Sequence, residues 1–343
     1  MRAEVHSVTA TSDIVVEIRN VSKTFRQRQR SEKVSDVWRN LFRPTYREIS
    51  ALTEITLTIP RGEIVAYAGA NGAGKSTTVK LCSGMLSPDS GTVRVLGMDP
   101  VRDRVRYVAR IGVVFGQRTE LWFDHPVAAS FEWKRVVWNI PRDRYERMLG
   151  FTRELLGLDD IMQTQARELS LGQRMRADLA LALLPEPEIL FLDEPTLGLD
   201  VLAKRNVLRF IQDLNRERQV TVLVTSHDMS DLEQLAGRIV MIDRGRIAFN
   251  GDFGTLRREY ADRRHLDIET SDISPPLLAN ARYKGSEGGR HTYVFDAGQV
   301  SVSALLEDAA AQCTILDVET HRIDIDEVIA DIYEKWQGRK PPN

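Results

Sequence analysis

The chain has 343 residues, and its net charge of -2, 42% apolar and 28% charged residues are ordinary for a globular protein. Its length exceeds what a single core usually serves, so we expect one large domain and one small one. Near-balanced acids and bases give no electrostatic case for nucleic acid, and no nucleic-acid partner is expected. Cys82 and Cys313 lack the count and spacing of a disulfide framework or a zinc site, so we expect both to be small buried residues.

The sequence offers no membrane-spanning segment. No apolar run approaches the roughly 18 residues that such a helix needs. Residues 1–13 lack the apolar core of a signal peptide. We therefore expect the chain to remain on the cytoplasmic side, with other chains crossing any membrane at which it acts.

The first elements in chain order are two predicted strands, residues 14–18 and 55–59, because both runs are rich in β-branched residues. The stretch between them, residues 26–48, is interpreted as an insertion. Within it, five apolar residues have the spacing of one helix face: Val34, Val37, Trp38, Leu41 and Phe42. Pro44 should end that helix. Its apolar face has three possible roles: packing on its own chain, docking on a partner, or lying on an anionic membrane surface.

A predicted strand at residues 63–68 leads into a glycine-rich turn and a helix that begins near Lys75. The spacing Gly69-x-x-x-x-Gly74-Lys75-Ser76 in this strand-loop-helix setting predicts a phosphate-binding loop for ATP, and the setting makes a chance match improbable. Lys75 should reach the β- and γ-phosphates, Ser76 should bind Mg²⁺, and Thr77 can donate to a phosphate. The predicted nucleotide contacts in this segment are Gly69, Asn71, Gly72, Ala73, Gly74, Lys75, Ser76 and Thr77.

The pattern is helical and amphipathic over about residues 117–175, which indicates a helical subdomain inserted into the α/β core. Near its start lies an apolar cluster of Leu121, Trp122, Phe123, Val127, Phe131 and Trp133. Two interpretations remain open for this cluster. It either forms the core of the subdomain or provides an exposed anchor for a partner's helix.

Two buried parallel strands are predicted at residues 189–192 and 220–225. Asp193 and Glu194 follow the first, at the strand end where ligands bind in open parallel sheets. Asp193 is expected to orient Mg²⁺, and Glu194 to act as the general base that polarises the attacking water. The alternative for both is a solvated strand end. His227 follows the second strand, a position that favours a functional role over a structural one.

Residues 239–249 contain two strands around a three-residue connection, Asp243-Arg244-Gly245, that suggests a bulged hairpin. Beyond residue 254 the pattern changes to a small α+β domain. Its strands are predicted at residues 265–270, 292–295 and 314–320, with a helix from about Ser303 and a glycine-rich, mobile turn at 285–289. A final helix has one apolar face, made of Ile325, Val328, Ile329, Ile332, Tyr333 and Trp336.

Leu169-Ser170-Leu171-Gly172-Gln173 resembles the signature sequence of the ABC ATPases. Gln117 stands where that family has its Q-loop glutamine, residues 197–200 where it has its D-loop, and His227 where it has its switch histidine. The resemblance covers about residues 13–254, so we expect an ATPase domain there and an accessory domain over residues 255–343. Leu171 departs from the family pattern, which has glycine, and we expect this to shift rates or affinity more than function.

This resemblance implies an α/β fold with a P-loop NTPase core: a RecA-like mixed sheet, an antiparallel β subdomain and an inserted helical subdomain. It also implies that two copies meet head to tail around ATP. The residues implied to act across that interface are Ser170, Gly172 and Gln173, and Asp200 of the D-loop is also expected at the nucleotide. Gln117 joins Ser76 and Asp193 at Mg²⁺, and His227 contacts the γ-phosphate. Phe25 is expected to stack on the adenine, with Tyr46 as the alternative platform and an ordinary core role as the alternative for Phe25.

The function implied is that of an ATP-binding and ATP-hydrolysing subunit of an ABC transporter. The insertion, Phe115-Gly116-Gln117 and the C-terminal domain resemble prokaryotic subunits that pair with separate exporter-type permeases. We expect a homodimer that binds two permease subunits at the cytoplasmic face of the membrane and exports a small molecule. The alternative is an ABC ATPase acting on ribosomes or DNA, which the single ATP site and the lack of long coiled coils disfavour. A third possibility is a regulatory nucleotide-binding module that does not hydrolyse ATP, and the presence of Glu194 and His227 disfavours it.

Overall fold

The computed structural model describes residues 14–28, 46–116, 118–260, 263–272 and 274–322, together with residues 325, 328, 329 and 332. The chain divides into two compact units. The larger comprises Met1–His227 and Asp231–Asn250, and the smaller comprises Gly251–Asn343 and Asp228–Ser230. Among the described helices, none has the length and apolar character needed to cross a membrane.

A six-stranded sheet in the order β5-β6-β7-β3-β8-β9 forms the centre of the larger unit. Its strands are β3 (Ile64–Gly69), β5 (Ile111–Phe115), β6 (Ile189–Asp193), β7 (Thr221–Ser226), β8 (Arg238–Asp243) and β9 (Arg246–Asp252). Strands β5, β6, β7, β3 and β8 pair in parallel. Strands β6 and β7 are buried throughout, as their continuous apolar runs predict. Their carboxyl ends therefore meet at one edge of the sheet.

The hairpin between β8 and β9 differs from the prediction of a bulged three-residue connection. Its connection has two residues, Arg244 and Gly245, and both have positive φ, 46° and 78°. Such a pair suits the two-residue turn whose twist matches that of the flanking strands.

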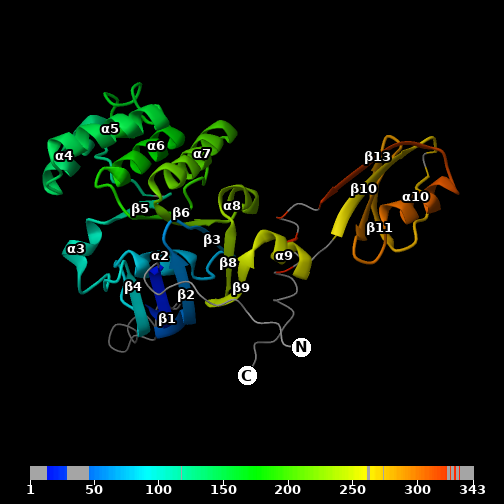
Figure 1. Cartoon of the computed structure of the whole chain (residues 1–343), viewed down its shortest axis with the longest axis horizontal. Coiled ribbons are helices and arrows are strands. Elements are labelled where there is room, and N and C mark those ends of the chain that lie inside the picture. The colour runs from blue at the N-terminus through cyan, green and yellow to red at the C-terminus, as the bar shows by residue number, and fades with distance from the viewer. Residues whose placement is uncertain are drawn as a thin grey trace, which may run out of the picture. The chain divides into compact units, whose positions relative to one another are not determined.

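A three-stranded antiparallel sheet, in the order β2-β1-β4, forms a second layer. Its strands are β1 (Ile14–Arg28), β2 (Tyr46–Pro60) and β4 (Ser90–Val95). The predicted insertion begins and ends as strand, because β1 and β2 stay paired up to Arg28 and Tyr46. The helix predicted from Val34 to Phe42 lies outside the described residues. Helix α2 (Lys75–Cys82) packs against strands of both sheets, which holds the turn before it in place (Figure 1).

The helical part of the larger unit begins with α3 (Arg104–Val108), α4 (Val127–Val137), α5 (Arg142–Leu156) and the short η1 (Ala166–Glu168). It continues with α6 (Leu171–Leu183), α7 (Val201–Arg218) and α8 (Met229–Leu235). Helix α6 packs on α4, α5, α7 and strand β5, so it connects the helical subdomain to the sheet. Figure 1 shows α4, α5 and α6 grouped together in green.

The smaller unit contains an antiparallel sheet in the order β11-β12-β10-β13. Its elements are α9 (Phe253–Tyr260), β10 (Arg263–Thr270), β11 (Ala281–Glu287), β12 (Arg290–Asp296), α10 (Val302–Ala310) and β13 (Ile315–Arg322). One core joins Leu266 and Ile268 of the sheet to Leu305 of α10. Strand β11 was not predicted, and it includes Gly285, so the predicted glycine-rich turn is shorter than expected.

The predicted final helix is described at four positions, Ile325, Val328, Ile329 and Ile332, which are helical and buried. Tyr333 and Trp336 lie outside the described residues. Of the two cysteines, Cys82 is fully buried and Cys313 is half-buried, and neither forms a disulfide. Burial raises the pKa of the Cys82 thiol to about 12, so Cys82 behaves as a small apolar residue.

Candidate active site

The phosphate loop lies between β3 and α2, and at two of its glycines a side chain would collide with neighbouring backbone. A Cβ at Gly69 would stand 2.6 Å from the carbonyl oxygen of Ile242, and one at Gly74 would stand 2.6 Å from that of Ala51. Gly74 also has a φ of 118°, a conformation that other residues rarely adopt. The loop thus passes close to two neighbouring backbones while its N–H groups and the start of α2 form an anion-binding cradle.

Lys75 is the first residue of α2, and only 5% of it is exposed. Its Nζ donates to the carbonyl oxygen of Gly69 at 2.7 Å and lies 4.0 Å from Oε1 of Glu194. Burial lowers the pKa of Lys75, whereas the carboxylates of Glu194 and Asp193 act in the opposite direction. The ammonium group is therefore held between the loop backbone and the carboxylates at the end of β6.

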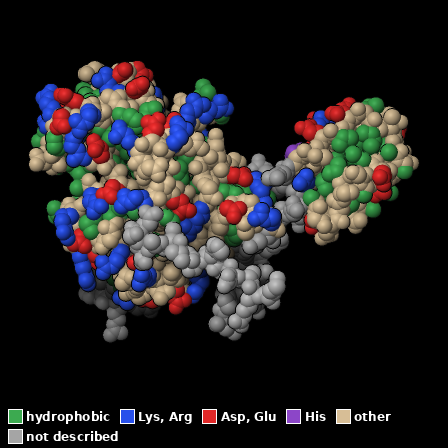
Figure 2. Space-filling model, viewed as in Figure 1, with side chains coloured by type: hydrophobic (Ala, Val, Ile, Leu, Met, Phe, Trp, Pro, Cys, Tyr) green, Lys and Arg blue, Asp and Glu red, His purple; other side chains and the backbone are tan. Residues whose placement is uncertain are grey.

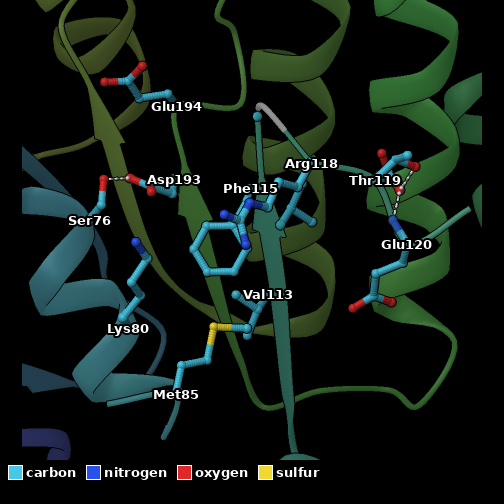
Figure 3. Close-up of a pocket in the computed structure, with 13 residues that line it drawn as sticks. Ser76, Lys80, Met85, Val113, Phe115, Arg118, Thr119, Glu120, Asp193 and Glu194 are labelled. Atoms are coloured by element: carbon cyan, nitrogen blue, oxygen red, sulfur yellow. Dashed lines mark hydrogen bonds between the residues drawn. The ribbon is translucent and has the colours of Figure 1, made fainter. Parts of the chain in front are cut away.

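Asp193, the last residue of β6, is 9% exposed and has two hydroxyl donors. Its Oδ1 accepts from Oγ of Ser76 at 3.1 Å (Figure 3). It also accepts from Oγ1 of Thr225 at 2.7 Å. Carboxylate and hydroxyl oxygens are ligands that suit Mg²⁺, which keeps several waters and takes few protein groups. Ser76 and Asp193 thus fit the predicted metal site.

Thr225 is a site residue that the sequence did not reveal. It lies beside Asp193 in the register of β6 and β7, and its hydroxyl also accepts the backbone N–H of Glu194 at 3.1 Å. One side chain therefore holds both the carboxylate of Asp193 and the backbone of Glu194. The signal for it was weak, a hydroxyl residue near the carboxyl end of a predicted neighbouring strand.

Glu194 has a φ of 56°, in the left-handed region that non-glycine residues rarely occupy. Such a conformation costs on the order of 1–3 kcal/mol, and it persists where surrounding contacts enforce it. Oε2 of Glu194 lies 3.7 Å from Nδ1 of His227, and the histidine side chain is about half exposed. The structure therefore brings together Lys75, Glu194 and His227 as the motifs indicated.

Gln117 lies outside the described residues, but Gly116 before it is informative. Its N–H donates to the carbonyl oxygen of Asp193 at 2.8 Å. A Cβ at Gly116 would stand 2.2 Å from the carbonyl oxygen of Glu194, so only glycine fits. The chain that leads into Gln117 therefore lies directly against the backbone of both carboxylates.

The signature residues form the start of α6. Ser170 caps the helix: its Oγ accepts the N–H of Gln173 at 3.2 Å, and Oε1 of Gln173 accepts the N–H of Ser170 at 2.9 Å. This capping box connects the two side chains to each other rather than to the phosphate loop. The N–H groups of Leu171 and Gly172 have no intrahelical carbonyl to bind, because they belong to the first turn. Asp200 similarly caps α7 through the N–H of Ala203 at 2.8 Å.

Other predicted nucleotide contacts lie in the phosphate loop, in α2 and in β1. Asn71 is exposed at the tip of the phosphate loop, and Thr77 is half-buried in α2. Phe25 is 38% exposed, with Nζ of Lys23 5.9 Å from its ring centroid. The interpretation of Phe25 as ordinary core is therefore wrong, whereas Tyr46, at 54% exposed, stays an alternative platform.

A cleft of about 420 Å³ extends from the carboxylates toward the helical subdomain (Figure 3). It is lined by Ser76, Lys80, Met85, Val113, Val114, Phe115, Gly116, Arg118, Thr119, Glu120, Asp178, Asp193 and Glu194. Asp178 of α6 is 7% exposed, and its Oδ1 accepts from Oγ1 of Thr119 at 2.8 Å and from the N–H of Glu120 at 3.1 Å. Burial raises the pKa of Asp178 to about 7. Asp178 therefore links the segment after Gln117 to the signature helix α6. The sequence did not indicate this role.

The apolar cluster of the helical subdomain divides in two. Leu121, Val127 and Phe131 are buried, as the core interpretation predicts. Trp122, Phe123 and Trp133 are 38%, 56% and 41% exposed, and the two tryptophan rings lie 5.4 Å apart. Figure 2 shows basic and acidic side chains interspersed over the visible face of the larger unit. On this face the charges form no continuous basic patch of the kind that binds nucleic acid.

Comparison with known proteins agrees with this geometry. The ABC transporter family matches residues 52–197. The ABC transporter ATP-binding protein NatA of Bacillus subtilis is 31% identical over 227 residues, which cover 66% of this chain and 91% of that protein. The methionine import ATP-binding protein MetN 1 of Rhodopseudomonas palustris is 30% identical over 294 residues, or 82% of this chain and 79% of that protein.

The fold has its counterpart among solved structures. A dimeric ATP-binding cassette in a post-hydrolysis state, bound to ADP and Pi, matches with a TM-score of 0.56 and 24% identity. The match covers 69% of this chain and 98% of that one. The expected P-loop NTPase fold is thereby confirmed. With the phosphate loop, the paired carboxylates and the signature helix in place, the chain belongs to the ATP-binding proteins of ABC transporters and is an ABC ATPase.

Proposed function

We propose that this chain hydrolyses ATP with Mg²⁺ as a head-to-tail homodimer and thereby powers export of a small molecule through separate permease subunits at the cytoplasmic face of the membrane. One observation carries the catalytic part of this proposal. Lys75, Ser76, Asp193, Glu194 and His227 converge at the carboxyl ends of β3, β6 and β7, the edge where open parallel sheets bind ligands.

Each residue has a role that its contacts support. Lys75 would bind the β- and γ-phosphates, and Ser76 and Asp193 would hold Mg²⁺, which would neutralise charge that develops on the phosphates. Gln117 lies outside the described residues and is assigned to the same ion by the family resemblance alone. Glu194 accepts a proton from the attacking water. His227 contacts the γ-phosphate and, 3.7 Å from Glu194, holds the carboxylate in its catalytic orientation.

The start of α6 supports a second copy as partner. Its N–H groups and the hydroxyl of Ser170 provide donors for an anion, yet the hydrogen bonds of Ser170 run within its own helix turn. Next to it, Val201 and Leu202 are 72% and 70% exposed at the start of α7. Adjacent exposed apolar side chains are typical of an interaction surface. The solved cassette that resembles this fold is described as a dimer bound to ADP and Pi.

Exposed aromatic residues support the permease as the other partner. Trp122, Phe123 and Trp133 combine large apolar area with few rotatable bonds, the properties of anchor residues in interfaces. Val136 and Val137 of α4, both more than half exposed, extend this surface. A cytoplasmic helix of a permease is the partner that suits an exposed aromatic surface of this kind.

Export is the part of the proposal that rests on resemblance, namely the insertion, the Phe115-Gly116-Gln117 segment and the C-terminal unit. A relative that covers most of the chain is named for methionine import. The direction therefore needs its own measurement. Loss of an exporter should raise the cellular content of its substrate, whereas loss of an importer should lower it, and comparison of metabolites in cells with and without the gene distinguishes the two.

The catalytic proposal is tested with Glu194→Gln. This variant should bind ATP, lose turnover by about 100-fold or more, and accumulate an ATP-bound dimer that size-exclusion chromatography resolves. Wild-type protein should remain monomeric after it has consumed its ATP. Normal hydrolysis by Glu194→Gln would refute the assigned base.

The partner proposal is tested by affinity purification of the full chain from its native membranes. A polytopic membrane protein should co-purify, and replacement of Trp122 and Phe123 by alanine should release it. Variant Leu155→Ala, which changes a 37% exposed leucine of α5, should retain it. Recovery of ribosomes or DNA in place of a membrane protein would favour the alternative function.

A further inference from the structure

Leu171 stands where the signature of the family has glycine, and its side chain contacts the D-loop of the same chain. A Cβ at Gly198 would lie 2.8 Å from Cδ2 of Leu171. The leucine side chain therefore packs directly against the glycine, whose φ is 71°. In the same turn, a Cβ at Gly172 would lie 3.0 Å from Cβ of Ala203. The first turn of α6 is thus packed against the D-loop and the first turn of α7.

Gly198 is connected to Glu194 by a short turn that contains two backbone hydrogen bonds. The N–H of Leu197 donates to the carbonyl oxygen of Glu194 at 3.3 Å, and the N–H of Leu199 donates to that of Thr196 at 3.3 Å. Pro195 and Thr196 are buried. A shift of Gly198 would therefore be transmitted to the backbone of Glu194, which already holds a strained φ.

Leu171 consequently has a functional group on either side of it. Ser170 precedes it at the start of α6, and through Gly198 it reaches the turn that carries Glu194. In the proposed dimer, Ser170 of each subunit contacts the ATP that is bound to the partner subunit. Glu194 of each subunit acts on the ATP that is bound to its own phosphate loop. Because Leu171 contacts Gly198, its side chain provides a path within one subunit between these two sites.

We propose that Leu171 is a positioning residue that couples the two ATP sites of the dimer, by transmitting the position of the signature turn to Glu194 through Gly198. The inference rests on the proposed head-to-tail dimer. A glycine at position 171 has no side chain to make this contact, so the substitution adds a rigid connection that the usual signature lacks. Packed contacts of this kind transmit displacements because they resist continuous deformation.

The test compares the ATP dependence of hydrolysis by the full chain with Leu171→Ala. Alanine is the best helix former, so this change removes the contact without weakening the start of α6. Wild type should show a Hill coefficient above unity, with about two as the limit for two coupled sites. Leu171→Ala should approach unity and lose roughly three- to tenfold in kcat. Leu171→Met, which conserves volume, should restore both.

Two further variants separate coupling from general packing. Leu155→Ala removes a leucine of the same size that is 37% exposed on α5, and it should keep the wild-type Hill coefficient. Gly198→Ala should displace Leu171 and reduce coupling, yet it should have little additional effect on coupling in a Leu171→Ala background, since the two changes remove the same contact.

An unchanged Hill coefficient in Leu171→Ala would overturn the inference, as would the same loss in Leu155→Ala or strict additivity of Leu171→Ala and Gly198→Ala. Failure of the dimer proposal has a different signature. In that case Glu194→Gln forms no ATP-bound dimer, and the wild type itself shows no cooperativity.

Discussion

Thr225 illustrates how one hydroxyl can organise a site. It donates to the carboxylate of Asp193 and accepts from the backbone N–H of Glu194, so it holds the side chain of the proposed metal ligand and the main chain of the proposed base. Loss of a group that orients a metal ligand typically lowers metal affinity or activity by about 10- to 100-fold. Thr225 therefore contributes through Asp193 and Glu194 rather than through contact with the nucleotide.

We predict that Thr225→Val lowers ATPase activity and apparent Mg²⁺ affinity by roughly 10- to 100-fold, because valine keeps the shape of threonine but lacks the hydroxyl. Thr225→Ser keeps the hydroxyl and should retain most of both. Titration of ATPase activity with Mg²⁺ measures the two effects. Equal Mg²⁺ dependence for the valine and serine variants would show that the hydroxyl has no such role.

Asp178 provides a prediction about pH. Its pKa is about 7 in the folded chain, against an ordinary value of 3.8. Between these values the folded state holds a proton that the unfolded state releases, so this group's contribution to stability falls as pH rises from about 4 to about 7. Above pH 7 both states are deprotonated, and the contribution is constant.

Asp178→Asn keeps Oδ1 as the acceptor for Thr119 and Glu120 but cannot ionise. We expect the variant to gain stability relative to wild type as pH rises from 4 to 7, by up to roughly 4 kcal/mol, since one pKa unit is worth about 1.4 kcal/mol. Denaturant unfolding of both proteins at several pH values measures the difference. Parallel pH profiles would contradict the prediction.

At the scale of elements, strand β5 matters because its carboxyl end touches the end of β6. Gly116 permits this approach, and a Cβ there would stand 2.2 Å from the carbonyl oxygen of Glu194. The relative positions of β5 and β6 are set by parallel pairing from Ile111 to Phe115. The chain that leads to Gln117 therefore has little room to move away from Glu194 as long as β5 stays in register.

We predict that Gly116→Ala displaces the carbonyl of Glu194 and lowers kcat strongly, with a loss of about 1–3 kcal/mol in the free energy of unfolding from overpacking. Gly150 offers a matched control on α5, where a Cβ would meet no atom within 4 Å. Gly150→Ala should leave kcat unchanged and stabilise the chain by about 0.5–1 kcal/mol. Steady-state kinetics and denaturant unfolding of the two variants decide this, and similar behaviour of both would refute the steric argument.

At the scale of the whole molecule, the described surface around the start of α6 and α7 has two features that bear on the proposed dimer. The capping box satisfies Ser170 and Gln173 within one turn, while Val201 and Leu202 beside it are left exposed. Both facts are explained if this face is covered by a second chain.

We predict that Val201→Asp, in a Glu194→Gln background, weakens the ATP-bound dimer by at least about tenfold, because a buried unpaired charge is costly at an interface. Val105→Asp, which changes an 85% exposed valine of α3, should leave dimerisation unchanged. Analytical ultracentrifugation with ATP over a range of protein concentrations measures both. An intact dimer in Val201→Asp would place the interface elsewhere.

The sequence by itself determined the motifs and most of the elements of the larger unit. Short-range geometry is enough for these features: glycines with positive φ in the phosphate loop, a serine and a glutamine three residues apart at a helix start, and apolar runs that end in carboxylates. The family and the fold followed from their order along the chain. Strand β11 escaped prediction because Lys284, Gly285 and Ser286 give it no apolar alternation.

Only the tertiary structure decided which distant residues act on one another. Thr225 bonds Asp193 because β6 and β7 pair in register. Gly116 contacts Glu194 because β5 lies beside β6. Leu171 packs against Gly198 because α6 packs on α7. Each of these contacts depends on strand register or helix packing, which propensity and spacing along the chain do not encode. The choice between buried and exposed members of the aromatic cluster has the same origin, since burial is a property of the assembled subdomain.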